Sequence, residues 1–141
     1  MSLSLSTLRQ GISSKIQELS GFKLSKHSPD SFGRTENTVA HLAFSVGLNS
    51  STATEERQRR SVGVYINTPV KVIFAYRLRP LDVYPTDYDL ALDTEQQVIQ
   101  KVLESYNSQE FTIRYIGSSR QVTDSQEYII ITIDFETLHT I

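Results

Sequence analysis

The sequence contains no cysteine. This excludes a disulfide framework, a thiolate nucleophile and a cysteine-based zinc site, and it agrees with a reducing compartment without proving one. The chain also lacks any apolar run near the ~18 residues that a membrane-spanning helix needs. Residues 1–8 have neither a basic region nor a continuous apolar stretch, so we expect no signal peptide and no anchor. We therefore expect a soluble protein without a membrane partner.

Signatures of the common enzyme and cofactor sites are also missing. The six glycines are scattered and form neither a P-loop nor a dinucleotide-binding fingerprint. There is no Gly-x-Ser-x-Gly elbow, and no two of His27, His41 and His139 have metal-ligand spacing. We interpret His41 as a surface or packing residue and His139 as a solvated one. The sequence thus predicts no catalytic residue, no metal and no cofactor, and we expect that the protein is not an enzyme.

A run of acidic residues leads into a predicted helix, and it comprises Asp82, Asp87, Asp89, Asp93 and Glu95. It does not fit a calcium-binding EF-hand loop, because the sixth position counted from Asp87 is Leu92 and not glycine. Carboxylates near a helix N-terminus interact favourably with the free N–H groups and the helix dipole, each by roughly 0.3–1 kcal/mol. We therefore interpret the run as helix stabilisation and not as a metal site.

The net charge of −2 conceals an uneven distribution along the chain. Residues 1–80 hold eleven Lys and Arg against five Asp and Glu, whereas residues 81–141 hold three against eleven. Either the two halves interleave in space and the asymmetry largely cancels, or the folded molecule has a basic face and an acidic face. The second arrangement would suit head-to-tail association, in which a closed rotation produces a ring.

The basic residues that stand closest together are Arg57, Arg59 and Arg60, within a polar stretch at residues 49–60. Glu55 and Glu56 adjoin them, so we do not expect a strong phosphate-binding surface. A dedicated nucleic-acid binder would normally be more basic and would interleave aromatic residues. We therefore expect no specific nucleic-acid partner.

Two helices are predicted from hydrophobic spacing. Apolar residues three and four apart indicate a helix over residues 4–20, with Gly21 placed to end it. The second helix follows the approach at residues 82–89 and contains the apolar residues up to Tyr106. Residues 25–37 and 49–60 are predicted as polar loops.

Alternation of apolar and polar residues predicts four strands, at residues 38–48, 62–78, 111–116 and 127–135. Pro69 lies inside the second strand, and because proline has no N–H for the ladder we expect a bulge or a bend there. Gly117 is predicted to end the third strand, followed by a polar turn at residues 118–126. The fourth strand has apolar residues on both faces, which is typical of an interior strand.

The resulting order of elements is helix, strand, strand, helix, strand, strand, within one domain covering residues 1–141. Consecutive strands joined by short links favour antiparallel pairing, and the helices need a sheet face to bury their apolar sides. The predicted fold class is therefore α+β: a two-layer sandwich of a mostly antiparallel sheet with two helices on one face.

Five segments follow one another in a characteristic order: Val39–Val46, the arginine-containing polar loop, Val70–Leu78, Asp87–Glu95, and Glu127–Glu136 with Leu138 and His139. Together they resemble the tail terminator, or tail completion, proteins of long-tailed bacteriophages. The resemblance is one of pattern and order and covers about residues 38–139. It implies a non-catalytic α+β subunit that forms a hexameric ring, caps the tail tube, ends tail elongation and docks the head connector.

The resemblance also implies the partners and the location. These are further copies of the chain, the tail tube protein and the head–tail connector or adaptor, in the tail or neck of a virion assembled in the host cytoplasm. DNA can pass through such a ring without a specific contact. From loop position and charge, we take as candidate subunit or partner contacts Arg57, Arg59, Arg60, Arg120 and Asp124. The segment between Gly21 and Asn37 is a second candidate contact element.

Other functions stay open at this point. The nearest is another neck, head–tail adaptor or baseplate component. A small ligand-binding α+β domain or enzyme would need a concave pocket with convergent polar groups. A regulatory nucleic-acid binder would show a salt-steep affinity for duplex DNA. Oligomeric state discriminates best among these, because only the structural component is expected to form rings.

Overall fold

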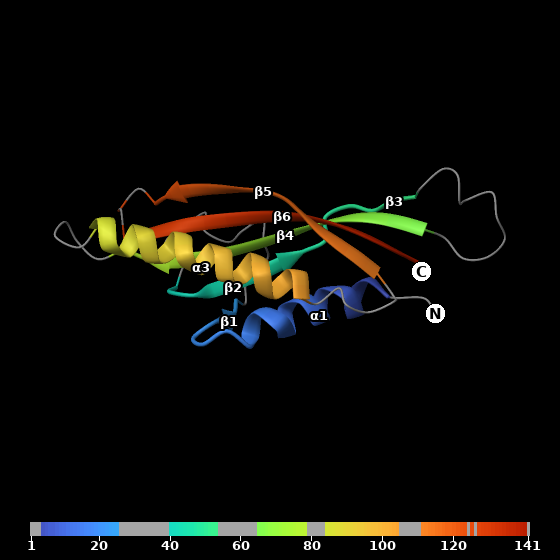
Figure 1. The fold of residues 1–141 in the computed structure, drawn as a ribbon, viewed down its shortest axis with the longest axis horizontal. Coiled ribbons are helices and arrows are strands. Elements are labelled where there is room, and N and C mark those ends of the chain that lie inside the picture. Colours follow the sequence, from blue (N-terminus) through green and yellow to red (C-terminus); the bar gives the residue numbers. More distant parts are fainter. Residues whose placement is uncertain are drawn as a thin grey trace.

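The computed structural model describes residues 4–25, 40–53, 65–78, 84–104, 111–123, 125 and 127–140. Over these residues the chain forms two helices and six strands (Figure 1). In chain order they are α1 (Leu5–Gln17), β1 (Lys23–Leu24), β2 (Ala43–Gly47), β3 (Thr52–Ala53), β4 (Tyr65–Arg77), α3 (Tyr84–Glu104), β5 (Phe111–Val122) and β6 (Tyr128–Thr140).

The strands form one sheet in the order β1-β2-β4-β6-β5, and β3 pairs with the first part of β4. All pairs are antiparallel except β1 with β2. Both helices lie on the same side of the sheet (Figure 1). The predicted fold class is confirmed. The predicted order of elements is not quite matched, because the short strands β1 and β3 are added, the latter within residues expected to be loop.

The helix α1 forms where the spacing of apolar residues predicts it, although it ends at Gln17. Ser4 caps its N-terminus, and the Ser4 hydroxyl accepts a hydrogen bond from the Thr7 N–H at 3.1 Å. The core-facing residues are Leu8, Ile12 and Ile16, all at most 2% exposed. Leu5, which shares their spacing, is 38% exposed because it lies in the first turn of the helix, near its end.

The strand β2 is shorter than predicted and begins at Ala43. Residues 40–42 form a turn instead, in which the Ala43 N–H donates to the Ala40 carbonyl at 3.1 Å. Leu42 has a positive φ of 59°, a conformation that a strand cannot contain. Within the strand, Phe44 lies on the helix side and Ala43 lies on the other side, as the alternation predicts.

The strand β4 runs without interruption through Pro69, so of the bulge or bend expected there, the bulge is wrong. All thirteen residues of β4 pair in unbroken register with β6, including Pro69 with Glu136. On its other side, β4 pairs with β3 up to Asn67 and with β2 only from Lys71. Pro69 falls between these two pairings, where neither β2 nor β3 supplies a partner.

The irregularity occurs instead in β5, at the glycine expected to end it. The register with β6 shifts between Tyr115 and Gly117, which leaves Ile116 as the additional residue of a β-bulge. Ile116 is 52% exposed. Because the bulge absorbs one residue, the strand continues to Val122, and most of the predicted polar turn at 118–126 is strand.

The main core lies between the helices and the sheet. Most of its sheet residues are apolar side chains at alternate positions of β4 and β6, joined by Phe44 and Val46 of β2 and Ile113 of β5: Val70, Val72, Phe74, Ile129, Ile131, Ile133 and Phe135. The strand β6 pairs with β4 and β5, so its predicted interior position is confirmed. Phe22 packs edge-on against Phe44 and Phe74, with ring centroids 6.0 and 5.5 Å away. Full burial of each such side chain stabilises the fold by roughly 1.5–3 kcal/mol.

Candidate functional site

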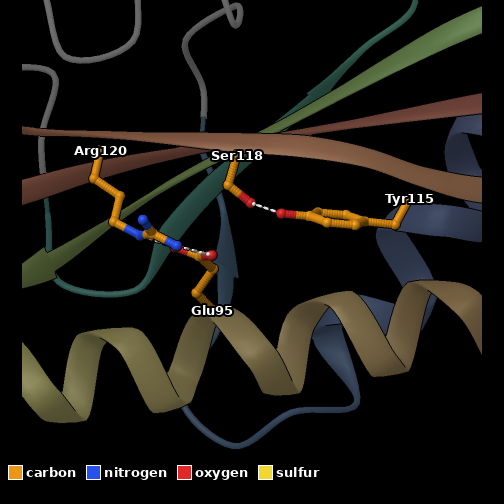
Figure 2. A network of polar contacts seen from close by, with 4 residues as sticks. All are labelled: Glu95, Tyr115, Ser118 and Arg120. Atoms are coloured by element: carbon orange, nitrogen blue, oxygen red, sulfur yellow. Dashed lines mark hydrogen bonds and ion pairs between the residues drawn. The ribbon is translucent and has the colours of Figure 1, made fainter.

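A bidentate ion pair joins α3 to β5 (Figure 2). Arg120 Nε donates to Glu95 Oε1 at 2.6 Å, and Arg120 Nη2 donates to Glu95 Oε2 at 2.7 Å. The Glu95 side chain is only 6% exposed, whereas that of Arg120 is 40% exposed. These hydrogen bonds raise the pKa of Arg120 above its ordinary value. Because a buried carboxylate without a partner is costly, the guanidinium is what allows Glu95 to remain inside the fold.

The bulge in β5 decides on which side of the sheet Arg120 lies. After the bulge, Arg120 pairs with Ile131, whose side chain is part of the main core, so both lie on the helix side. A register shifted by one residue would place Arg120 on the opposite side, away from Glu95. Next to the bulge, the Tyr115 hydroxyl and the Ser118 Oγ lie 2.6 Å apart on the same side as the ion pair (Figure 2).

Of the five predicted contact residues, Arg120 is the one that the structure describes. It lies in a strand and not in a loop, and it is bound to Glu95 while two fifths of its side chain remain exposed. The other four, Arg57, Arg59, Arg60 and Asp124, lie outside the described residues, as do residues 26–37 of the second candidate contact element.

Sequence reasoning missed Glu95 as a partner of Arg120. It grouped Glu95 with the carboxylates at the helix N-terminus, which, among the described residues of that run, holds only for Asp87, in the first turn of α3. The available signal was the spacing: Glu95 stands four residues after Ala91 and three before Val98, both of which are fully buried. A carboxylate at such a position of a helix indicates a buried ion pair.

A pocket of about 250 Å³ lies where β4 ends and α3 begins, lined by His41, Tyr76, Arg77, Asp87 and Leu90. The Arg77 N–H donates to His41 Nδ1 at 3.0 Å, so the neutral imidazole has its proton on Nε2. The rings of His41 and Tyr76 meet edge-on at 4.7 Å. His41 is therefore a surface and packing residue, as predicted, although it precedes β2 and is not part of the strand.

Partial burial lowers the pKa of His41, and the charge of Arg77 lowers it further, against an opposing effect of Asp87. The imidazole is therefore neutral at pH 7. Its Nε2–H is a hydrogen-bond donor and not a positive charge. Among the described residues that line the pocket, the charged groups are thus one guanidinium, on Arg77, and one carboxylate, on Asp87, which is 3% exposed.

His139 is buried, so the prediction of a solvated residue is wrong. It is 2% exposed, and its Nε2 lies 3.0 Å from the Thr68 hydroxyl. That hydroxyl lies 2.9 Å from the Ser51 Oγ, and the Thr137 hydroxyl donates to the Thr68 carbonyl at 2.8 Å. The reason is that β6 continues to Thr140 and pairs His139 with Ile66, beyond the predicted end of the strand.

The contact between a hydroxyl and an imidazole can in principle produce a nucleophile. Thr68, however, is fully buried, and a nucleophile must be accessible to its substrate. A buried, hydrogen-bonded network of this kind instead stabilises the pairing of the strands that contribute to it, here β4 and β6. We therefore assign the Ser51, Thr68 and His139 cluster a structural role.

Within the described ranges, no group of three His, Cys, Asp or Glu residues could hold a metal ion. None of the helices in those ranges is long and apolar enough to cross a membrane. No model of a known protein family matches the chain, and no curated protein matches it either.

Proposed function

We propose that the protein is a structural component of a bacteriophage tail. Copies of the chain form a ring that caps the tail tube, ends its elongation and joins the tail to the head connector. The proposal places the protein in the tail or neck of the virion and assigns it no reaction. Its partners are further copies of itself, the tail tube protein and the connector.

The observation that supports this proposal best is the fold itself. Over the described residues the chain is a two-layer α+β subunit with both helices on one side of a mostly antiparallel sheet. This is the subunit architecture that the resemblance implies. The cluster around Thr68 and the ion pair of Glu95 both have structural explanations. Thr68 is fully buried, and Glu95 is bound to Arg120.

A second observation concerns the uneven charge. The three basic residues of the second half all form ion pairs: Lys101 with Glu18 and Glu104, Arg114 with Glu136, and Arg120 with Glu95. Among the described residues the structure records no ion pair for the exposed Asp89 and Asp93 of α3. The acidic excess of the second half is therefore still present on the folded surface, which suits association with a basic surface of another subunit.

The alternative that a specific observation favours is a small ligand-binding domain. The pocket beside His41 presents several polar groups, as such a site requires. Its volume of about 250 Å³ lies below the roughly 300–1,000 Å³ of typical ligand sites. The pocket is therefore closer in size to a single side chain than to a ligand. Another neck, adaptor or baseplate component would share the fold and differ in its partners.

The test of the proposed function is the mass of the purified protein by light scattering, across protein and salt concentration, with negative-stain imaging of the largest species. Rings of about six copies are expected. These rings should then shorten the tubes formed by the tail tube protein when both are mixed. A protein that stays monomeric, even beside growing tubes, and leaves their length unchanged would contradict the proposal.

A further inference from the structure

Unpaired charge in the helix layer is basic on one helix and acidic on the other. Among the described residues, the structure records no ion pair for Arg9 of α1 or for Asp89 and Asp93 of α3. The remaining charged residues described in the two helices are engaged within the chain, namely Lys15, Asp87, Glu95, Lys101 and Glu104. The two helices therefore carry complementary charge that their own chain does not neutralise.

The other described basic residues without an ion pair belong to the opposite side of the sheet. Lys71 and Arg77 occupy positions of β4 that alternate with its core residues, so they point away from the helix layer. Lys23 pairs with Ala43, whose side chain also packs on that far side. In the part of the chain that the structure describes, Arg9 is thus the unpaired cation of the helix layer.

The two helices are staggered and run in opposite directions (Figure 1). They meet near their C-terminal ends, where Lys101 of α3 binds Glu18, the residue that follows α1, at 3.2 Å. From this contact the N-terminal half of α1 extends toward one end of the molecule, and the N-terminal half of α3 extends toward the other (Figure 1).

This stagger separates the unpaired charges within one molecule. Arg9 stands nine residues before Glu18. Asp93 stands eight residues before Lys101, and Asp89 lies one turn further away. At about 1.5 Å per residue, roughly 25 Å separates Arg9 from Asp93 along the helix axes. The side chains cannot bridge such a distance, so these opposite charges can meet only between two copies.

An exposed leucine accompanies the unpaired charge on each helix. Leu5 is 38% exposed and stands one turn before Arg9, so the two side chains are neighbours on the surface of α1. Leu90 is 43% exposed and stands three residues before Asp93 on α3. It also borders the pocket of about 250 Å³ at the end of β4. Each N-terminal half therefore presents an apolar side chain next to a charge.

We propose that the N-terminal half of α1 in one copy packs against the N-terminal half of α3 in a second copy of this chain. Leu5 then covers Leu90 at the border of the pocket, which removes both leucines from water. Arg9 lies beside Asp89 and Asp93, which are one turn apart, and its guanidinium has enough N–H donors to bind both carboxylates.

This contact is heterologous, since each copy contributes α1 from one end and α3 from the other. Heterologous contacts form a ring when the rotation between neighbours closes, and a filament when it does not. The inference rests on the proposed ring and names the residues that join neighbouring copies within it.

Charge reversal at position 9 tests the ion pair. Arg9→Glu should weaken association about tenfold or more, since a carboxylate then faces Asp89 and Asp93. Adding Asp93→Arg to the same chain should recover much of that loss by restoring an opposite pair. Lys23→Glu is the matched control, because it changes the net charge equally at an exposed position on the far side of the sheet. It should leave association unaltered.

The absence of cysteine allows a second readout by cross-linking. Leu5→Cys and Leu90→Cys are purified separately, mixed and treated with a short bismaleimide. We expect a cross-linked dimer in the mixture and none with either variant alone. In the control mixture Leu138→Cys replaces Leu90→Cys, since Leu138 is similarly exposed, at 41%, but alternates with the core residues of β6. That mixture should remain uncross-linked. Circular dichroism should show the same fold for every variant, because none of the substituted residues belongs to the core.

The outcomes separate the contact from the ring. Rings that form equally well with Arg9→Glu, or that give no more cross-linking between positions 5 and 90 than the control mixture gives, would overturn the contact and leave the ring. Cross-linked filaments in place of rings would support the contact and contradict the proposed function. A protein that neither associates nor cross-links, even beside growing tail tubes, would overturn both.

Discussion

Gly21 packs against Leu42 so closely that a Cβ on Gly21 would lie 2.9 Å from Leu42 Cδ1 and would require the end of that side chain to shift. Gly21 has a φ of 87°, in the left-handed region, and lies in the turn that follows α1, four residues after Gln17. The contact joins the chain that leaves α1 to the turn that begins β2. Both residues have positive φ, so the connection between helix and sheet depends on two left-handed residues packed against each other.

Substitution of Gly21 by Ala should therefore destabilise the protein by about 1–3 kcal/mol, mainly because a residue with a side chain is strained at a φ of 87°, and in addition because the Leu42 side chain must shift. Gly11 is the matched control, since it lies inside α1 with open space around it. Gly11→Ala should stabilise by roughly 0.5–1 kcal/mol through helix propensity. Urea unfolding measures both, and equal effects of the two substitutions would contradict the role of Gly21.

Arg120→Ala should cost about 2–3 kcal/mol, because it leaves the buried Glu95 carboxylate without its two hydrogen bonds. Arg114→Ala breaks an ion pair of similar type with Glu136, but there the arginine side chain is 70% exposed. That variant should lose less than about 1 kcal/mol. Chemical unfolding of the two alanine variants provides the comparison, and a similar loss in both would show that the burial of Glu95 is unimportant.

Thr68→Val should destabilise by about 1–3 kcal/mol although its volume is nearly unchanged. The substitution removes the hydroxyl that lies between Ser51 Oγ and His139 Nε2 in a fully buried position. Thr112→Val, at an exposed position of β5, controls for the preference of strands for valine and should be close to neutral. Thermal unfolding of both variants tests this, and a neutral Thr68→Val would exclude the buried network as a source of stability.

The pKa of His41 is lower in the folded protein than its ordinary value of about 6.5, mainly because of partial burial. The unfolded chain therefore binds the proton more readily than the folded protein does. The stability that depends on neutral His41 is complete above pH 6.5 and is lost as the pH falls through the folded pKa. NMR titration of the His41 ring should show a midpoint below 6.5.

The effect on stability can be isolated with His41→Gln. Below pH 6.5, the unfolding free energy of this variant should decline less steeply than that of the wild type. Above pH 6.5, the two slopes should coincide. A His41 midpoint above 6.5, or a wild-type decline that the substitution leaves unaltered, would contradict the assignment.

The elements with regular apolar spacing could be predicted from the sequence. Leu8, Ile12 and Ile16 repeat at helical spacing and are buried, and the alternate residues of β4 and β6 form the core side of the sheet. The end of β5 could not be predicted, because the bulge at Ile116 breaks the alternation and the following residues are polar. Arg120 is on the helix side for a reason that appears only once β5 is aligned with β6.

The polar clusters depended on tertiary contacts that no local pattern contains. Glu95 and Arg120 are 25 positions apart, and Thr68 and His139 are 71 apart. A histidine near the end of a chain gives no local sign that it pairs with the start of a strand so far away. Pro69 shows the opposite case, in which a residue that usually interrupts a ladder is accommodated because β2 and β3 leave its position unpaired.

The long ladder between β4 and β6 affects the order of events during synthesis. It joins Arg77 to Tyr128 and Tyr65 to Thr140, separations of 51 and 75 positions. Such distant pairings form slowly, and they cannot begin until the ribosome has released the final strand. Before β6 is synthesised, the nascent chain already contains all of its arginines and most of its carboxylates. At that stage it still lacks the central strand of its sheet. In the proposed ring, association of subunits would therefore require that translation has first reached the end of β6.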